Sequence, residues 1–189
     1  MPQHNNEAEA HLSLPVSDRR DHIRGNPSGE VTLVEYGDFQ CPHCGRAHPI
    51  ITQLLERMGD DIRFVFRNFP LTQMHPDAQL AAESAESAAT QGKFWEMHDA
   101  LYENQEALDP QSLSSYAADL DLNLPQFQLE LAEHKHLPRV REDFSSGVRS
   151  GVNGTPTFFI NGRRHDGAWD LESLMAAIEE EMEQETGAR

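Results

Sequence analysis

The stretch VTLVEYGDFQCPHCGRAHP, residues 31–49, decides the fold of this 189-residue chain. It begins with Val31–Tyr36, a run of β-branched and aromatic residues long enough for a strand buried on both faces. Cys41 and Cys44 follow at once, and they are the only cysteines in the sequence. A Cys-X-X-Cys pair directly after a buried strand is therefore the main clue to function.

After the cysteines, apolar residues recur at helical spacing up to Gly59, and Ile62–Phe69 (IRFVFRNF) has the composition of a second strand. A strand, a helix and a strand in close succession predict a βαβ unit, with parallel strands and a right-handed crossover. The buried face of the helix is expected to carry Ile50, Leu54, Leu55 and Met58.

Residues from about 75 to 150 are predicted to form a helical insertion. Pro76, Pro110, Pro125 and Pro138 stand where first helical positions are expected, and Asp109 and Asn123 are suited to capping. Three stripes at helical spacing predict packing faces without chemistry of their own. The stripes are Ala81, Ala85 and Ala88; Leu113, Tyr116, Ala117 and Leu120; and Val140, Phe144 and Val148.

The C-terminal part returns to strand. Thr157–Ile160 (TFFI) leads into Asn161-Gly162, a strong hairpin signal, and Arg163–His165 is expected to pair back. Asp170 is suited to cap a last helix whose glutamates face solvent. Its apolar stripe is Leu171, Leu174, Met175, Ile178 and Met182. The predicted class is α/β, in the order βαβ, several helices, then ββα.

The length indicates one domain with a real core. We expect residues 1–28 to form a loose arm that ends in the turn of residues 26–29, and residues 29–186 to form the domain. Fifteen basic and 32 acidic residues give a formal net charge of −17. A surface this negative repels phosphate backbones and anionic lipids, so neither nucleic acid nor a membrane surface is an expected partner.

The distribution of apolar residues bears on the expected location of the protein. No apolar run approaches the roughly 20 residues that span a bilayer, and residues 1–30 contain no apolar stretch like the core of a signal peptide. We therefore expect a cytoplasmic location. Two cysteines also exclude a framework of several disulfides.

The motif Cys41-Pro42-His43-Cys44 stands where the first strand gives way to the first helix. Free amide N–H groups and the helix dipole at that point stabilise a thiolate at Cys41, and the thiolate is the form that attacks disulfides. His43 offers a cation or hydrogen-bond donor beside the sulfur. Cys44, one turn further, is expected to be less exposed and to resolve a mixed disulfide.

Two other interpretations of the pair remain open. Cys-Pro-His-Cys-Gly also resembles a zinc knuckle, with His48 as a third ligand, but a structural zinc site needs four ligands and there is no second cysteine pair. An inert pair of core cysteines is the other interpretation. A loop-to-helix junction that contains proline and histidine is a poor place for inert packing.

The chain resembles the thioredoxin fold through these features, together with Pro49 and with Thr155-Pro156 directly before the TFFI strand. The CPHC motif and the helical insertion are similar to DsbA-type proteins. The resemblance covers roughly residues 22–180, through VTLVEYGDFQCPHCGRAHP, GKFWEMHDALY and SGVNGTPTFFINGRRHDGAWD. These segments are similar to DsbA-like domains that occur alone in bacteria or fused after sodium/proton antiporters. The implied fold is a thioredoxin fold with a helical insertion before the strand that follows the cis-proline.

The resemblance implies a role for each matching residue. Cys41 is implied to be the nucleophile and Cys44 the resolving thiol. Pro156 is implied to be cis, and the Thr155 backbone to pair with an extended substrate. Glu35, six residues before Cys41, matches the family's buried acid for proton transfer to the inner cysteine. The strand pattern agrees, because Glu35 shares a face with apolar residues; the alternative is that the strand has ended and Glu35 is solvated.

The predicted function is that of a thiol–disulfide oxidoreductase without a bound cofactor or metal, acting on disulfide- or thiol-containing proteins or on glutathione. The alternatives are a zinc-stabilised interaction module and a glutathione-dependent transferase or isomerase; relatives of the latter kind generally lack the second cysteine. His48 lies on the helix face of Cys44, and we expect it to be a surface histidine. We expect His98 to be a core histidine.

Overall fold

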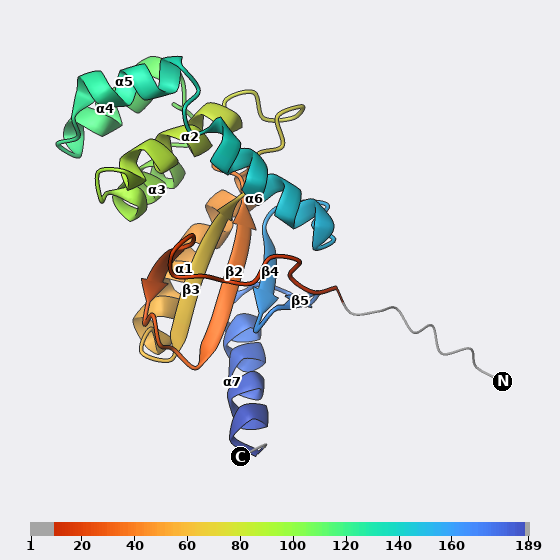
Figure 1. Cartoon of the computed structure of the whole chain (residues 1–189). Coiled ribbons are helices and arrows are strands. Elements are labelled where there is room, and N and C mark those ends of the chain that lie inside the picture. The colour runs from red at the N-terminus through yellow and green to blue at the C-terminus, as the bar shows by residue number, and fades with distance from the viewer. Residues whose placement is uncertain (1–9, 188–189) are drawn as a thin grey trace.

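Two apolar strands, β2 and β3, run parallel at the centre of a five-stranded sheet, and helix α1 connects them (Figure 1). The predicted βαβ unit is therefore confirmed. Across the sheet the order is β1-β3-β2-β4-β5, and every pair except β2 and β3 is antiparallel. This computed structural model describes residues 10–187. The bounds are β1 (His22–Gly25), β2 (Val31–Gly37), α1 (Pro42–Met58), β3 (Ile62–Asn68), β4 (Thr157–Ile160) and β5 (Arg163–His165).

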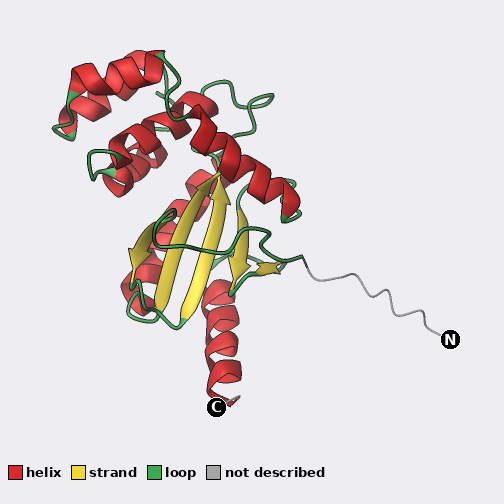
Figure 2. Ribbon diagram, viewed as in Figure 1, coloured by secondary structure: helices red, strands yellow, loops and turns green. Residues whose placement is uncertain are grey.

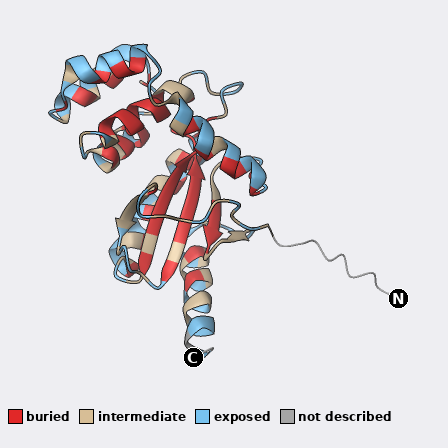
Figure 3. Ribbon diagram, viewed as in Figure 1, coloured by how far each residue is buried: buried red, intermediate tan, exposed pale blue. Residues whose placement is uncertain are grey.

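Each face of the sheet buries its own apolar cluster. On one face, α1 and α7 (Leu171–Gly187) pack against alternate residues of β2, β3 and β4, including Leu33, Phe64 and Phe158. On the other face, Val34, Val65 and Phe159 are covered by the N-terminal segment and by Phe144 of the insertion. Figure 3 shows the consequence, since β2 and β3 are buried along almost their whole length. Within the described residues, no helix is long and apolar enough to cross a membrane.

The insertion stands beyond the carboxyl ends of β2 and β3, where the arrowheads of these strands lie in Figure 2. It buries its own cluster, which also includes Phe39, Cys41 and Cys44 from the end of β2 and the start of α1. The redox motif therefore lies between the sheet and the insertion. The helices of the insertion are α2 (Ala78–Ala89), α3 (Phe94–Glu103), α4 (Pro110–Asp119), α5 (Leu124–Ala132) and α6 (Leu137–Arg149).

Most of the predicted helix starts, and the hairpin, agree with the structure to within one residue. Asp109 and Asn123 cap α4 and α5, and Asp170 accepts from the amide of Ser173 at the start of α7. Asn161 and Gly162 have φ values of 46° and 82°, as a tight β4–β5 hairpin turn requires. One start is wrong: α2 begins at Ala78, two residues after Pro76. Pro125 and Pro138 occupy second rather than first helical positions.

The expected loose arm is wrong over its described part, residues 10–28. His22–Gly25 form β1, which pairs antiparallel with β3, and the chain before it is bridged to β5 through His11 and Arg163. The predicted turn of residues 26–29 is present, closed by a 2.9 Å hydrogen bond from the amide of Gly29 to the carbonyl of Asn26. Residues 1–9 of the expected arm lie outside the described part of the chain.

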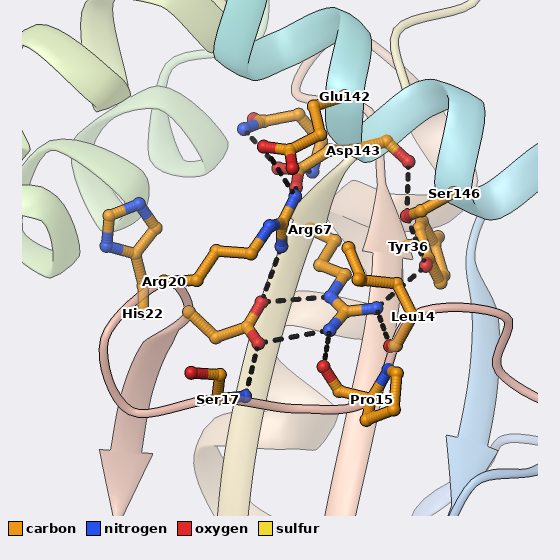
Figure 4. A network of polar contacts seen from close by, with 12 residues as sticks. Leu14, Pro15, Ser17, Arg20, His22, Tyr36, Arg67, Glu142, Asp143 and Ser146 are labelled. Carbon is orange, nitrogen blue, oxygen red and sulfur yellow. Dashed lines mark hydrogen bonds and ion pairs between the residues drawn. The ribbon is translucent and has the colours of Figure 1, made fainter.

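A buried arginine holds this segment to the sheet (Figure 4). The guanidinium of Arg67 on β3 is fully buried and donates to both carboxylate oxygens of Asp21, at 2.9 and 3.0 Å. It also donates to the carbonyls of Leu14 and Pro15 and to the hydroxyl of Tyr36. All five N–H groups of an arginine are thereby used. Residues 14–21 thus take part in a buried network of hydrogen bonds and an ion pair with Arg67, and they do not form a solvated arm.

Candidate active site

Cys41 is the N-cap of α1, with extended backbone angles of φ −72° and ψ 123°, and Pro42 occupies the first turn. Proline suits this position because its missing N–H would have no partner there and its φ is already helical. Both cysteines are buried, Cys41 with 4% and Cys44 with 0% of its surface exposed. The first turn of α1 contains no acidic residue, so its free N–H groups face the Cys41 sulfur without a competing charge.

These surroundings lower the pKa of Cys41 from 9.0 to about 5. The largest cause is a hydrogen bond from the Cys44 thiol; burial acts in the opposite direction, and the Thr155 side chain and the amides of Cys44 and His43 add to the lowering. Cys44 behaves in the reverse way. Its burial, its hydrogen bond to Cys41 and the charge of Glu35 raise its pKa well above 9.0. At neutral pH one sulfur is thus charged and the other protonated.

Glu35 is 2% exposed, which decides between the two interpretations of this side chain in favour of burial. It lies between Phe66 of β3 and Phe158 of β4 in the register of the sheet, and its Oε1 has no hydrogen-bond partner within the described residues. Burial, and then the charge on Cys41, raise the pKa of Glu35 from 4.5 to about 8. A carboxyl group with this pKa exchanges its proton near neutral pH.

The segment before β4 lies opposite Cys41. The Thr155-Pro156 peptide bond is cis, as predicted, and the carbonyl oxygen of Thr155 is 3.5 Å from the Cys41 sulfur. A groove runs along this segment towards Arg164, His165 and Trp169. The geometry leaves the Thr155-Pro156 backbone beside the sulfur that carries the negative charge.

The ring of His43 contacts the side chain of Arg46. The histidine side chain is exposed, and its Nδ1 lies 2.6 Å from the Arg46 guanidinium. His43 stabilises the Cys41 thiolate through its backbone N–H. The predicted role of the ring, as a cation or hydrogen-bond donor beside the sulfur, stays a prediction.

The prediction of a surface position for His48 is wrong, because its side chain is only 14% exposed and its ring stacks on Tyr102. His98 is buried, as predicted, and its Nδ1 lies 2.9 Å from Asp99 Oδ1. His48, His98 and Asp99 lie close enough to suggest a metal site. However, Asp99 accepts two hydrogen bonds from Arg24, at 3.0 and 2.7 Å. Its carboxylate is therefore already paired with the positively charged guanidinium of Arg24.

The two cysteines do not belong to a cluster of at least three potential metal ligands in the described part of the chain, residues 10–187. A structural zinc site needs four ligands. His48, the third ligand considered for a zinc knuckle, belongs to the cluster with His98 and Asp99.

Two residues of the insertion lie at the site although they were not predicted to belong to it. The Tyr102 hydroxyl is buried without a hydrogen-bond partner in the described structure, and burial, followed by the charges of Cys44 and Glu35, raises its pKa. The Gln105 side chain donates hydrogen bonds to the backbone at Cys41. Both lie more than fifty residues from the motif in sequence, and no spacing rule connects them to it.

Comparison with known sequences agrees with this geometry. A family model described as Thioredoxin matches residues 17–180. The chain is 50% identical over 167 residues to the Na(+)/H(+) antiporter NhaA 1 of Salinispora arenicola, and 40% identical over 168 residues to the NhaA antiporter of Herminiimonas arsenicoxydans. These matches cover 88% and 89% of this chain but only 26% and 27% of the antiporters. The chain thus spans about a quarter of the length of these relatives.

Solved structures show the same fold. BdbD of Bacillus subtilis superimposes with a TM-score of 0.81 at 23% identity, over 92% of this chain and 98% of that one. A thioredoxin-like oxidoreductase of Silicibacter pomeroyi gives 0.78 at 26% identity, over 88% and 94%. For α-DsbA1 of Wolbachia pipientis the values are 0.78 and 21%, over 94% and 98%. With the family match over most of its length, the chain belongs to the thioredoxin family and has the fold of its DsbA-like members.

Proposed function

We propose that the protein is a thiol–disulfide oxidoreductase that exchanges disulfides with protein or small thiol substrates through Cys41 and Cys44. The observation that carries this proposal is the contrast between the two sulfurs. Cys41 has a pKa of about 5, and Cys44 keeps its proton well above pH 9. A stable thiolate beside a protonated thiol is what a nucleophile and a resolving group require.

The first step is attack by the Cys41 thiolate on a substrate disulfide. A bond forms between Cys41 Sγ and one substrate sulfur, the substrate S–S bond breaks, and the other sulfur leaves as a thiolate that takes a proton from solvent. The attacked chain lies along the Thr155-Pro156 segment, whose carbonyl is 3.5 Å from the Cys41 sulfur. The product is a mixed disulfide in which Cys41 carries no charge.

Loss of that charge prepares the second step. The Cys41 thiolate raises the pKa of Glu35 while it is present, so formation of the mixed disulfide lowers this pKa and favours the ionised carboxylate. Glu35 then accepts the proton of Cys44, and the Cys44 thiolate attacks Cys41 Sγ. The Cys41–Cys44 bond forms and the substrate leaves as its second thiolate. The substrate is reduced, the protein is oxidised, and the reverse sequence oxidises a dithiol.

The direction of electron flow follows from the surroundings of the protein. The stabilised thiolate exists only in the reduced state, so it favours the dithiol form and makes the pair a good oxidant. A reducing compartment holds such a pair as the dithiol, whereas an oxidising compartment keeps it as the disulfide. Equilibration with glutathione buffers of known potential measures this preference.

Trapping of the intermediate tests the proposal. With a disulfide-containing model protein, Cys44→Ser is expected to accumulate a mixed disulfide on non-reducing gels, because Cys41 still attacks but nothing resolves the product. Cys41→Ser is expected to accumulate none. Equal trapping by both variants would overturn the assignment of roles. Zinc in the freshly purified protein at one equivalent, lost in Cys41→Ser, would instead support an interaction module.

A further inference from the structure

The side chain of Gln105, in the insertion, forms hydrogen bonds with the backbone on both sides of Gln40. Gln105, in the loop between α3 and α4, donates from Nε2 to the carbonyl of Phe39 at 2.8 Å and to the carbonyl of Cys41 at 2.9 Å. A primary amide nitrogen has two N–H groups, so it satisfies both carbonyls at once. No other side chain donates to the Cys41 carbonyl within the described residues.

The same amide also lies on the first turn of α1. A Cβ atom at Gly45 would be 2.0 Å from Gln105 Oε1, which is far inside contact distance. The Cys41 carbonyl that accepts from Gln105 also accepts from the amide of Gly45, at 3.0 Å. The Gln105 side chain therefore packs against Gly45, the residue that follows the Cys-Pro-His-Cys motif. It fits there because glycine has no side chain.

On this geometry we propose that Gln105 is a positioning residue, which fixes the Cys41 backbone so that the sulfur stays against the amide N–H groups of His43 and Cys44. The inference rests on the proposed function. The sulfur benefits from those N–H groups only while Cys41 keeps its place as N-cap, in the extended conformation that precedes the helix. Gln105 supplies that restraint from a loop 64 residues away, so the insertion tunes the redox pair as well as covering it.

Gln105→Met tests this, because methionine keeps the length of the side chain and removes both donors. We expect the pH midpoint of Cys41 alkylation by iodoacetamide to rise by about one unit, the equivalent of a tenfold loss of thiolate stability. The equilibrium with glutathione should then move up to tenfold towards the protein disulfide, since only the reduced state loses stabilisation. Gln91→Met is the matched control. Gln91 accepts a 2.7 Å bond from the Asn123 amide in another loop of the insertion, and we expect no change in either measurement.

A second variant changes Gly45, the residue against which the Gln105 amide packs. Gly45→Ala adds a methyl group where the Gln105 amide lies and favours the helix itself, because alanine is the better helix former. We expect the same rise of the Cys41 midpoint, and no further rise when it is combined with Gln105→Met. If Gln105→Met does not fold, Gly45→Ala decides the matter alone.

The outcomes separate this inference from the proposed function. A midpoint equal to that of the wild type in folded Gln105→Met or Gly45→Ala overturns the positioning role and leaves the oxidoreductase intact. A wild-type protein whose Cys41 shows no low-pH reactivity and no exchange with glutathione overturns the proposed function itself.

Discussion

The sulfur of Cys41 lies 3.5 Å from the carbonyl oxygen of Thr155, although 114 residues separate them in sequence. The contact joins the start of α1 to the segment that enters β4, which pairs with β2. Because β2 also leads into the cysteine motif, a single strand sets the positions of both. The sulfur with the lowered pKa thus has a backbone carbonyl directly beside it.

Glu35→Gln is expected to slow resolution of the mixed disulfide by about 10²-fold or more, since proton transfer by a positioned side chain typically contributes that much. Attack by Cys41 should be little affected. Stopped-flow measurement of the two steps with a fluorescent mixed-disulfide substrate separates them. An unchanged rate of resolution would mean that Cys44 loses its proton by another route.

The same two groups have opposite effects on stability as the pH changes. The pKa of Glu35 is about 8 in the folded protein and 4.5 ordinarily, so the folded state binds more protons and stability falls from about pH 4.5 to 8. The pKa of Cys41 is about 5 instead of 9.0, so the unfolded state binds more protons and stability rises from about pH 5 to 9. Each slope is at most about 1.4 kcal/mol per pH unit.

In the reduced wild type these two slopes largely cancel. We expect the free energy of unfolding of reduced Glu35→Gln, measured in urea and compared with the reduced wild type, to increase between pH 5 and 8. The oxidised wild type lacks the Cys41 thiolate and should show the reverse trend relative to its reduced form. Parallel curves for variant and wild type would contradict a raised pKa of Glu35.

His43→Ala is expected to change the Cys41 pKa by less than about half a unit, which corresponds to less than about 15 mV in reduction potential. The reason is that the ring is held by Arg46, whereas the backbone N–H that serves the thiolate is kept in alanine. Thiolate absorbance against pH gives the pKa. A rise of the Cys41 pKa by a full unit would mean that the imidazole ring itself stabilises the thiolate.

Asp21→Ala is expected to lower the free energy of unfolding by about 3–5 kcal/mol, because it leaves the guanidinium of Arg67 buried without its counter-charge. Asp18→Ala is the matched control. Asp18 pairs with Arg63 at the surface, where its side chain is 71% exposed, and loss of such a pair costs about 1 kcal/mol or less. Chemical denaturation of both variants gives the comparison; equal losses would mean that the N-terminal segment is not locked by Arg67.

Local sequence was sufficient for most of the elements, though not for β1, and for the redox pair. Hydrophobic periodicity from Val31 to Phe69 determined the βαβ unit, and proline, aspartate and asparagine at helix starts determined most of the helix starts in the insertion. The motif placed Cys41 at a helix N-terminus, where the low pKa of its sulfur follows from nearby donors. The amides of His43 and Cys44 and the thiol of Cys44, which help to lower this pKa, lie within one turn of Cys41.

Tertiary structure alone decided what surrounds the sulfur. The burial of Glu35, left open by the sequence, depends on Phe66 and Phe158 on neighbouring strands. The hydrogen bonds of Gln105 and the lock between Arg67 and Asp21 join segments 46 or more residues apart, and no periodicity records such pairs. Arg67 and Asp21 are polar residues that are buried here because each meets its partner only when the chain has folded.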